Sequence, residues 1–372
     1  MNLLWIPHQT WLNRGGITRD KHLIENLKGK HEIHVIQHTQ PFQNNIKSFI
    51  KPKNLIDSLE DWTIFENGIY HHHIRHIYFT RFKPFLKINN IIFESKIKKI
   101  IKDYAIEVIF CGPSHYLHGY PPFNINIPIV FDYVDFLHDF SDPNIENTKI
   151  LSNYYKHSTK ILCVSKTLIE SIPTFYRSKA IYLPNGVDLD FYKTYNFENK
   201  RKKYKFITLI GLNISESLFY IDIFPEIKKK VENAKMLLVG GGIRYPIIKQ
   251  YILKKKNPED FILTGFIDYE NIRKYFYMTD VGLNPTLKNR YYDSACPLKV
   301  MEYTAASKPV VSTNLEELRR LNFPNIFLAE PTSQDFQNKV INALNYNGTF
   351  PDLKEYDWQY LSNKLEAILK NI

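Results

Sequence analysis

The feature that most constrains the fold is a regular alternation of short apolar runs with stretches of helical periodicity. The runs Ile207–Ile210 and Met236–Val239 are apolar at nearly every position. Parallel strands that are covered on both faces have this composition. Because strands that alternate with helices form βα units, the sequence predicts an α/β protein built on parallel sheets.

Two sets of strands follow from this pattern. In the first half we expect strands at Asn2–Pro7, His31–His38, Glu107–Cys111, Ile127–Phe131 and Lys160–Val164. Helices are expected between them, at about Thr18–Leu27, Phe93–Lys102 and Ile145–Lys156. In the second half we expect strands at Phe206–Ile210, Lys235–Val239, Phe261–Thr264, Val281–Asn284 and Pro309–Ser312, with helices between them.

A basic, aromatic connector at about Tyr192–Lys205 separates the two sets. Since 372 residues suffice for two or three domains, we expect two doubly wound halves joined near residue 195. The least regular segment is Asn44–Lys87. Apolar residues recur at helical spacing in Trp358–Leu369, which predicts an amphipathic terminal helix.

Charge and cysteine content limit the kind of protein. Lys+Arg 49 against Asp+Glu 38 gives a net charge of +11, which permits contact with an anionic membrane, a nucleotide or a nucleic acid. Cys111, Cys163 and Cys296 stand singly, so we expect a reducing compartment and neither a disulfide scaffold nor a zinc module. No apolar run approaches the roughly 20 residues of a membrane span, and Met1–Pro7 lacks the features of a signal peptide. We therefore expect a soluble, cytoplasmic protein.

Glycines follow two of the expected strands. Gly15 and Gly16 come after the first, and Thr18 can cap the helix that begins there. Such a loop lets backbone N–H groups approach a phosphate at the carboxyl edge of a parallel sheet, or it is a tight turn that needs glycine geometry. Gly240–Gly242 allow the same two interpretations. Neither loop has the spacing of a dinucleotide fingerprint or a P-loop, which disfavours NAD binding and ATP hydrolysis.

The expected strand Val281–Asn284 leads into a polar loop and a helix. The loop carries Lys288, Arg290 and Asp293. These groups follow the end of a buried strand, where the open edge of a parallel sheet binds ligands.

Pro297 and Leu298 open the helix, which carries Lys299 and Glu302. A proline in the first turn leaves the N–H groups of its neighbours available. Together with the helix dipole and Lys299, these groups suit a diphosphate, and Glu302 can accept hydrogen bonds from a ribose diol. The alternative is a solvated helix face. Glu302 stands among apolar residues, where an unpaired carboxylate would be costly, so we favour a functional role.

Acidic groups also follow a strand in the first half. Asp132 and Asp135 come at the end of Ile127–Phe131, where they could orient an acceptor hydroxyl or take up a proton, or one of them could cap the next helix. Further candidates of this kind are His115, His118, His138 and Asp139. The cluster His71–His73 with His76 could bind a metal ion, although such clusters in basic loops are more often solvated.

Several segments, taken in order, resemble the retaining glycosyltransferases of the GT-B fold and family 4 type, the glycosyl transferases group 1, over nearly the whole chain. The most specific are Asn-Gly-Val-Asp within Leu183–Tyr192 and the runs Glu-Tyr-Thr-Ala and Lys-Pro-Val-Val within Pro297–Val311. The others are the Gly15-Gly16 loop, Cys163–Leu168, Leu237–Gly242 and Leu263–Ile267. In addition, Pro128–Asp135 resembles a subgroup that acts on bacterial-type surface polysaccharides.

The resemblance implies two Rossmann-like domains that face a central cleft. Residues 1–190 would bind the acceptor, and residues 191–355 would bind a nucleotide-diphosphate sugar. The terminal helix 356–372 would cross back to the first domain.

The resemblance also implies roles for single residues. Glu302 would bind the ribose, and backbone amides around Pro297 and Leu298 would meet the phosphates. Phe266 and Ile267 would hold the base. The remaining residues assigned to the donor are Gly15, Gly16, Asn213, Gly241, Gly242, Arg244 and Arg290, with Gly16 approaching the diphosphate from the first domain.

The chain departs from the family pattern at three places. The first of two glutamates spaced eight apart is absent, because position 294 is Ser294 and Asp293 lies one place off. The usual Arg and Lys are missing from residues 211–217, so Lys299, Arg290 or Arg244 would balance the diphosphate charge. Where the family often has a His, the chain has Asp135, which becomes the candidate to touch the reacting sugar. We therefore expect Asp135, Lys299 and Asp132 to be the catalytic residues.

The expected function is transfer of a sugar from a UDP-, GDP- or other nucleotide sugar to a glycan, lipid-linked or protein-linked acceptor, with retention of anomeric configuration. No metal and no further cofactor are expected, because amides and a lysine can stabilise the departing diphosphate. Alternatives are a nucleotide-sugar epimerase on the same fold and a non-catalytic two-lobed binding protein. A nucleic-acid binder would explain the charge, but no recognition signature accompanies it. We expect instead peripheral contact with an anionic membrane that carries a lipid-linked acceptor.

Overall fold

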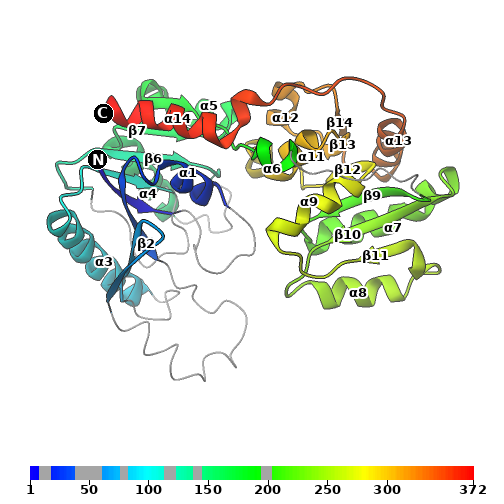
Figure 1. Cartoon of the computed structure of the whole chain (residues 1–372), viewed down its shortest axis with the longest axis horizontal. Coiled ribbons are helices and arrows are strands. Elements are labelled where there is room, and N and C mark those ends of the chain that lie inside the picture. The colour runs from blue at the N-terminus through cyan, green and yellow to red at the C-terminus, as the bar shows by residue number, and fades with distance from the viewer. Residues whose placement is uncertain (8–17, 38–60, 76–82, 113–122, 137–144, 194–202) are drawn as a thin grey trace. The chain divides into compact units, whose positions relative to one another are not determined.

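The computed structural model divides the chain into two compact units. Unit 1 comprises Met1–Leu183 and Leu361–Ile372, and unit 2 comprises Pro184–Tyr360 (Figure 1). The structure describes all residues except 8–17, 38–60, 76–82, 113–122, 137–144 and 194–202, and the side chains of 83–86 and 145–149 are also left out. Unit 2 begins before the predicted residue 191 because the segment after Leu183 packs within it: the Val187 N–H donates to the Tyr356 carbonyl at 2.8 Å.

The sheet of unit 2 has six parallel strands in the order β11-β10-β9-β12-β13-β14. Numbered along this unit, the order is 3-2-1-4-5-6, which is that of the doubly wound nucleotide-binding sheet. The strands are β9 (Lys205–Ile210), β10 (Ala234–Val239), β11 (Phe261–Leu263), β12 (Val281–Asn284), β13 (Val310–Thr313) and β14 (Ile326–Ala329).

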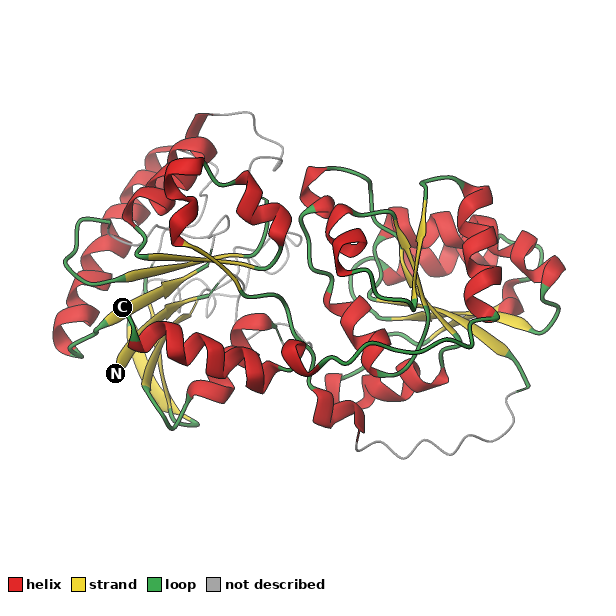
Figure 2. Cartoon of the chain, turned by 90° about the horizontal axis from the view of Figure 1, so that it is seen from above, coloured by secondary structure: helices red, strands yellow, loops and turns green. Residues whose placement is uncertain are grey.

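Helices cover both faces of this sheet (Figure 2). One face packs against α7 (Ile214–Lys230), α8 (Tyr245–Leu253) and α13 (Ser333–Leu344). The other packs against α6 (Leu189–Lys193), α9 (Tyr269–Met278), α11 (Leu298–Ala305) and α12 (Glu316–Leu321). Leu209 enters the first core and Ile210 the second. Alternate side chains of one strand are therefore buried on opposite faces, which is why the run in the sequence is apolar without a period of two.

The sheet of unit 1 has eight strands in the order β3-β4-β2-β1-β5-β6-β7-β8, of which β3 pairs antiparallel. The strands are β1 (Asn2–Ile6), β2 (Glu32–Gln37), β3 (Trp62–Glu66), β4 (Ile69–His73), β5 (Val108–Cys111), β6 (Ile129–Tyr133), β7 (Lys160–Cys163) and β8 (Ala180–Tyr182). The described helices are α1 (Arg19–Leu27), α3 (Lys83–Asp103), α4 (Ile145–His157), α5 (Lys166–Ser171) and α14 (Trp358–Lys370), with the 3-10 turn η3 (Thr174–Lys179).

The terminal helix α14 returns to unit 1, as the family resemblance implied (Figure 1). Its buried residues Leu361, Leu365 and Leu369 repeat every four positions on one face. The ammonium of Lys364 donates to the Tyr182 carbonyl at 2.9 Å, and Glu366 pairs with Lys30 at 2.7 Å.

The predicted strands are all present, and their ends shift by one or two residues. The prediction of an irregular, solvated segment around His71–His73 is wrong, because these residues form the buried strand β4. Strands β3 and β4 form a hairpin whose two-residue turn is Asn67-Gly68, with φ of 52° and 82°. This dipeptide favours such turns because both positions need positive φ. Two further strands, β8 and β14, were also missed.

Candidate functional site

The candidate site of unit 2 lies where the strand order reverses. Strands β9 and β12 are neighbours, and the chain leaves them toward opposite faces, through α7 after β9 and α11 after β12. Ligands of doubly wound sheets bind at the carboxyl ends of the strands at such a point. The site is therefore built from the start of α7, the start of α11 and the neighbouring loops.

Helix α11 is fixed to the sheet by Tyr303. The Tyr303 hydroxyl donates to the Thr208 carbonyl of β9 at 2.8 Å. Its ring lies against Gly282 of β12 so closely that a Cβ on that glycine would come within 2.5 Å of the ring. A glycine in the centre of this strand thus allows the close approach of the ring.

At the N-terminus of α11, the first amide groups have no hydrogen-bond acceptor among the described residues. Pro297 is the N-cap and supplies no side-chain hydrogen bond. The first amides of a helix have no partner within it, so those of Leu298 and Lys299 can meet an anion. The side chain of Asn185 donates to the Cys296 carbonyl at 2.8 Å, so the Pro184-Asn185-Gly186 turn holds the approach to this helix.

Glu302 lies one turn into α11 and is half-buried. The Tyr192 hydroxyl of α6 donates to its Oε1 at 3.3 Å. Burial raises the pKa of Glu302 to about 7, against the lowering effects of the Tyr192 hydrogen bond and of the Lys299 charge. The alternative of a solvated helix face therefore does not hold for this carboxyl group.

Lys299 is electrostatically coupled to two carboxyl groups. Burial lowers the pKa of its ammonium group, and the charges of Glu216 and Glu302 partly restore it. Within the described part of the chain, the Lys299 ammonium makes no hydrogen bond and no ion pair. A half-buried cation without a direct partner is suited to an anionic ligand.

The sequence analysis did not predict two residues of this candidate site, Glu216 and Tyr192. Glu216 is buried in the first turn of α7, where the Asn213 side chain donates to its Oε1 at 3.4 Å. Burial raises the pKa of Glu216, and the charge of Lys299, the Asn213 hydrogen bond and the charge of Arg244 oppose this. Arg244 itself is exposed. The structure thus couples two predicted donor-binding cations, Lys299 and Arg244, to one acid.

The second glycine loop approaches the segment after β11. Gly240 and Gly265 form a bridge, and a Cβ on Gly241 would lie 2.6 Å from the Phe266 nitrogen. Gly242 has φ of +89°. Both the turn geometry and the close approach therefore require glycine here. Phe266 is 64% exposed, whereas Ile267 packs on the core under α9 and α11.

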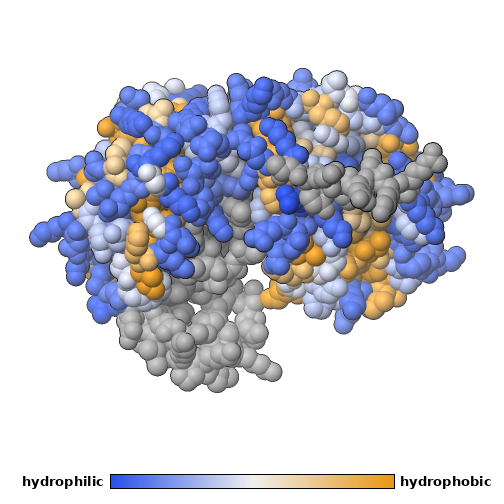
Figure 3. Space-filling model, viewed as in Figure 1, coloured by the Kyte–Doolittle hydropathy of each residue, from blue (hydrophilic) through white to orange (hydrophobic). Residues whose placement is uncertain are grey.

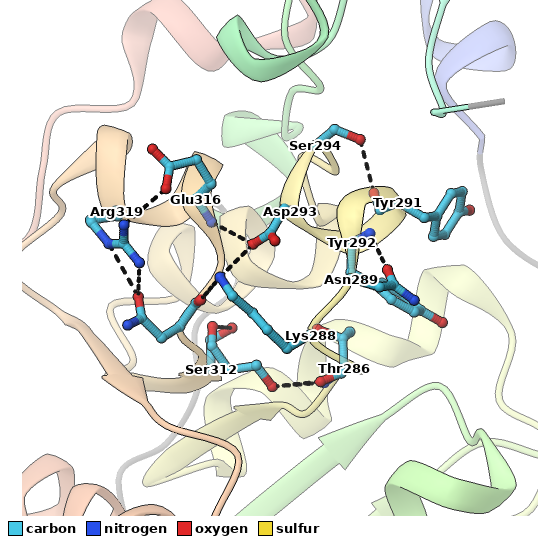
Figure 4. Close-up of polar contacts among 12 residues, drawn as sticks. Thr286, Lys288, Asn289, Tyr291, Tyr292, Asp293, Ser294, Ser312, Glu316 and Arg319 are labelled. Carbon is cyan, nitrogen blue, oxygen red and sulfur yellow. Dashed lines mark hydrogen bonds and ion pairs between the residues drawn. The ribbon is translucent and has the colours of Figure 1, made fainter. Parts of the chain in front are cut away.

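The loop before α11 forms its own polar network (Figure 4). The carboxylate of Asp293, in the short helix α10 (Arg290–Asp293), pairs with Lys288 at 2.6 Å and accepts the Glu316 N–H at 3.0 Å. The buried Ser294 donates to the Tyr291 carbonyl at 2.9 Å. Asp293 and Ser294 thus bind groups of this loop and of α12. Arg290 is exposed at the start of α10.

In unit 1, Asp132 forms a buried ion pair with Arg19. Asp132 lies within β6, not beyond its end, and is 1% exposed. Arg19 of α1 donates to both of its carboxylate oxygens, from Nε at 2.8 Å and from Nη2 at 2.9 Å. Asp135 follows β6 and is half-buried. The candidates outside the described residues are Gly15, Gly16, His76, His115, His118, His138 and Asp139.

The histidines of β4 join a buried hydrogen-bonded chain. His72 Nε2 lies 2.9 Å from His34 Nδ1, and His34 Nε2 lies 2.9 Å from Glu32 Oε1. The Thr63 hydroxyl lies 2.9 Å from His72 Nδ1. In the described part of the chain, no three His, Cys, Asp or Glu side chains gather in a way that could hold a metal ion.

The chain is similar to known proteins over unit 2 and, more weakly, over most of its length. Residues 205–346, almost all of the sheet and helices of unit 2, match the family model of the glycosyl transferases group 1. Over 344 residues the chain is 24% identical to an uncharacterized glycosyltransferase of Methanocaldococcus jannaschii, covering 89% of this chain and 85% of that one. The chain is a glycosyltransferase whose second unit resembles the group 1 family.

Other relatives of this glycosyltransferase agree with that family. A putative teichuronic acid biosynthesis glycosyltransferase, TuaH of Bacillus subtilis, is 35% identical over 66 residues, which span 18% of this chain and 17% of the relative. The sucrose-phosphate synthase of Thermosynechococcus elongatus has a similar structure, with a TM-score of 0.70 and 11% identity over 100% of this chain and 98% of that one. Anabaena HepE, solved with UDP and glucose, gives a TM-score of 0.65 and 12% identity over the full length of both chains. These structures show the GT-B fold.

Among the helices that the structure describes, none is both long enough and apolar enough to cross a bilayer.

Proposed function

We propose that unit 2 binds a nucleotide-diphosphate sugar and that the enzyme transfers the sugar, with retention of anomeric configuration, to a glycan, lipid-linked or protein-linked acceptor. The observation that carries the proposal is the group Glu216, Lys299 and Glu302 at the point where the strand order reverses. Lys299, which has no direct partner among the described residues, lies beside the first amides of α11, and this combination suits a diphosphate. A carboxyl group one turn further suits a ribose diol.

The solved structure of Anabaena HepE supports this choice of donor, since it contains UDP and glucose on a similar fold. By that analogy, Glu302 binds the ribose and Phe266 and Ile267 flank the base. The loop of Gly241 and Gly242 and the side chain of Asn213 complete the donor site. Arg244, just before α8, and Arg290, at the start of α10, are exposed and add positive charge to unit 2. In unit 1, Asp135 is our candidate catalytic carboxylate.

The proposed sugar transfer depends on stabilising the negative charge that develops on the departing diphosphate. The bond between the anomeric carbon and the diphosphate oxygen breaks, and a bond to the acceptor oxygen forms on the same face of the sugar. The acceptor hydroxyl gives its proton to the departing diphosphate oxygen. Negative charge thus grows on the diphosphate, where Lys299 and the α11 amides stabilise it without reorganising. We propose that this stabilisation needs no metal ion, so transfer should continue in EDTA.

Donor binding by the purified enzyme tests the proposal. Calorimetry with UDP and GDP should detect binding of one of them, and Glu302→Ala should weaken it more than tenfold. A matched control is Glu259→Ala, which removes an exposed carboxylate beside the opposite end of the sheet, just before β11. Equal affinity in Glu302→Ala and the wild type would refute the ribose assignment.

Product analysis then separates transfer from the alternatives. Incubation with labelled UDP- and GDP-sugars and a panel of glycan and lipid-linked acceptors should give a glycosylated acceptor and a free nucleotide. A changed sugar still attached to its nucleotide would identify an epimerase instead. Binding without any conversion of donor would favour a two-lobed binding protein.

We also propose that the enzyme contacts an anionic membrane from its cytoplasmic side. The net charge of +11 supports this proposal, because anionic headgroups attract basic surfaces. A lipid-linked acceptor would be reached at that surface.

A further inference from the structure

Helix α8 of unit 2 exposes large aliphatic side chains. Its inner face is anchored by Ile248 and Ile252, which are buried in the core against α7. On the outer side, Ile247 is 50% exposed and Leu253 is 63% exposed, and Ile243 just before the helix is 65% exposed. Single exposed aliphatic residues are common on protein surfaces, but a group of them on one short helix marks an interaction surface.

The same segment is basic throughout. Residues 243–257 contain five Lys or Arg residues and no Asp or Glu. Lys255 is held by Asp222 of α7, whereas Lys249, Lys254 and Lys256 are exposed. Because successive residues lie about 100° apart around a helix, Lys249 and Lys254 flank Leu253, and Ile247 lies beside Lys254. Figure 3 shows hydrophobic and hydrophilic side chains side by side over this part of unit 2.

We propose that Ile243, Ile247 and Leu253, together with Lys249, Lys254 and Lys256, form a docking surface for an anionic membrane. The "α8 surface" denotes these six residues. The inference rests on the membrane contact proposed above and names the surface that makes it.

The combination of lysines and aliphatic side chains favours an anionic membrane over other binding partners. Lysines that alternate with exposed aliphatic side chains bind anionic headgroups while the aliphatic side chains enter the boundary with the acyl chains. An acidic protein or a polyanion would use the lysines and leave the aliphatic residues in water. An uncharged apolar partner would give the three exposed lysines no counter-charge.

A second helix offers a matched comparison. On α3 of unit 1, Ile88 is 41% exposed and Ile91 is 68% exposed. Two lysines of that helix already have acidic partners, since Lys96 pairs with Asp61 and Lys98 with Glu94. Lys87, Lys99 and Lys102 of α3 are exposed like the cations of the α8 surface. However, α3 also carries the acidic residues Glu94 and Asp103, whereas residues 243–257 contain none, so charge complementarity favours α8.

Vesicle sedimentation with the full-length enzyme tests the α8 surface. We expect binding to vesicles of phosphatidylcholine and phosphatidylglycerol at about 7:3, weaker binding at high salt, and little binding to phosphatidylcholine alone. Ile247→Ser/Leu253→Ser and Lys249→Glu/Lys254→Glu/Lys256→Glu should each lower the affinity at least tenfold. The control Ile88→Ser/Ile91→Ser should bind like the wild type. Calorimetry with UDP or GDP shows that unit 2 of the α8 variants is folded, because none of these residues belongs to the donor site. Thermal unfolding shows that the α3 control is folded, since α3 belongs to unit 1.

The outcomes separate the two proposals. If the wild type binds anionic vesicles and both α8 variants bind equally well, the α8 surface is wrong and membrane contact stands. If only the α3 control loses vesicle binding, the α8 surface is likewise wrong and membrane contact stands. If the lysine variant loses binding while the aliphatic variant keeps it, the surface serves an acidic macromolecule and our assignment is overturned. If the wild type binds no vesicle, both membrane proposals fail, while donor binding is judged independently.

Discussion

At the scale of single residues, Glu302 makes unit 2 sensitive to pH. Its pKa is raised by burial from an ordinary value of 4.5 to about 7. The unfolded chain ionises at the ordinary value, so the folded state loses stability as pH rises from about 4.5 to about 7, and the full loss persists above. Glu302→Gln removes this titration. We therefore expect the melting temperature of the wild type, relative to that of Glu302→Gln, to fall between about pH 4.5 and about pH 7 in scanning calorimetry. A constant difference across this range would contradict the assigned pKa.

The pair Arg19 and Asp132 is the second residue-scale prediction. Both side chains are buried, with two hydrogen bonds between them. Asp132→Leu leaves the guanidinium buried without its counter-charge and should destabilise unit 1 by about 3–5 kcal/mol. The double variant Arg19→Met/Asp132→Leu should recover most of this loss in denaturant unfolding. If the double variant also transfers sugar at the wild-type rate, Asp132 acts in structure and not in catalysis. A stable but inactive double variant would restore its predicted catalytic role.

These residues show what a sequence can predict about a site. A functional role for Glu302 was predicted because its apolar neighbours make an unpaired carboxylate costly. That argument needs only residues that are close in the sequence. Glu216 sits beside Asn213 in the first turn of a helix, but its coupling to Lys299 joins residues of α7 and α11. Likewise, the partner of Asp132 lies 113 positions away, on α1. Pairings of this kind are set by the topology of the sheet and cannot be derived from the pattern along the chain.

At the scale of elements, the contact between β12 and α11 sets the position of Lys299 and Glu302. A Cβ on Gly282 would lie 2.5 Å from the Tyr303 ring. Gly282→Ala should therefore push the ring and the helix away, at a cost of roughly 1–3 kcal/mol, and weaken nucleotide binding as well. Tyr303→Phe is the control, because it keeps the ring and loses one hydrogen bond worth about 1 kcal/mol. Chemical unfolding and calorimetry with UDP or GDP measure both effects. Wild-type stability of Gly282→Ala would show that the ring is free to move.

Elements buried on both faces were predicted well, because continuous apolar runs such as Met236–Val239 have few alternatives. The elements that were missed are short or lie toward a sheet edge. Strand β8 has three half-buried residues, and β14 is half-buried at three of its four positions. The strand β4 was missed for another reason: three consecutive histidines suggest a solvated loop. Two of them, His71 and His72, are buried here because hydrogen bonds to Gln37, His34 and Thr63 satisfy ring nitrogens.

At the scale of the whole molecule, the last residues of the chain complete the first unit. Leu361–Ile372 belongs to unit 1, although more than 170 residues of unit 2 precede it in the sequence. The sequence indicated an amphipathic helix, but only the family resemblance indicated which domain its apolar face would cover. Hydrophobic periodicity predicts that a face is buried and does not identify its partner.

This arrangement makes a prediction that separates the two units. Leu365 is fully buried on α14, so Leu365→Ala should leave a cavity that costs about 2–5 kcal/mol. Because α14 belongs to unit 1, the loss should appear as faster amide hydrogen exchange in β7 and β8, whereas exchange in β9 and β12 should stay unchanged. The control Tyr360→Ala truncates an exposed side chain and should alter neither unit. Equal acceleration in both sheets would mean that the units unfold as one cooperative body. In that case α14 would couple the stability of unit 2 to that of unit 1, and a nucleotide that binds unit 2, as we propose, would slow exchange in β7 and β8 too.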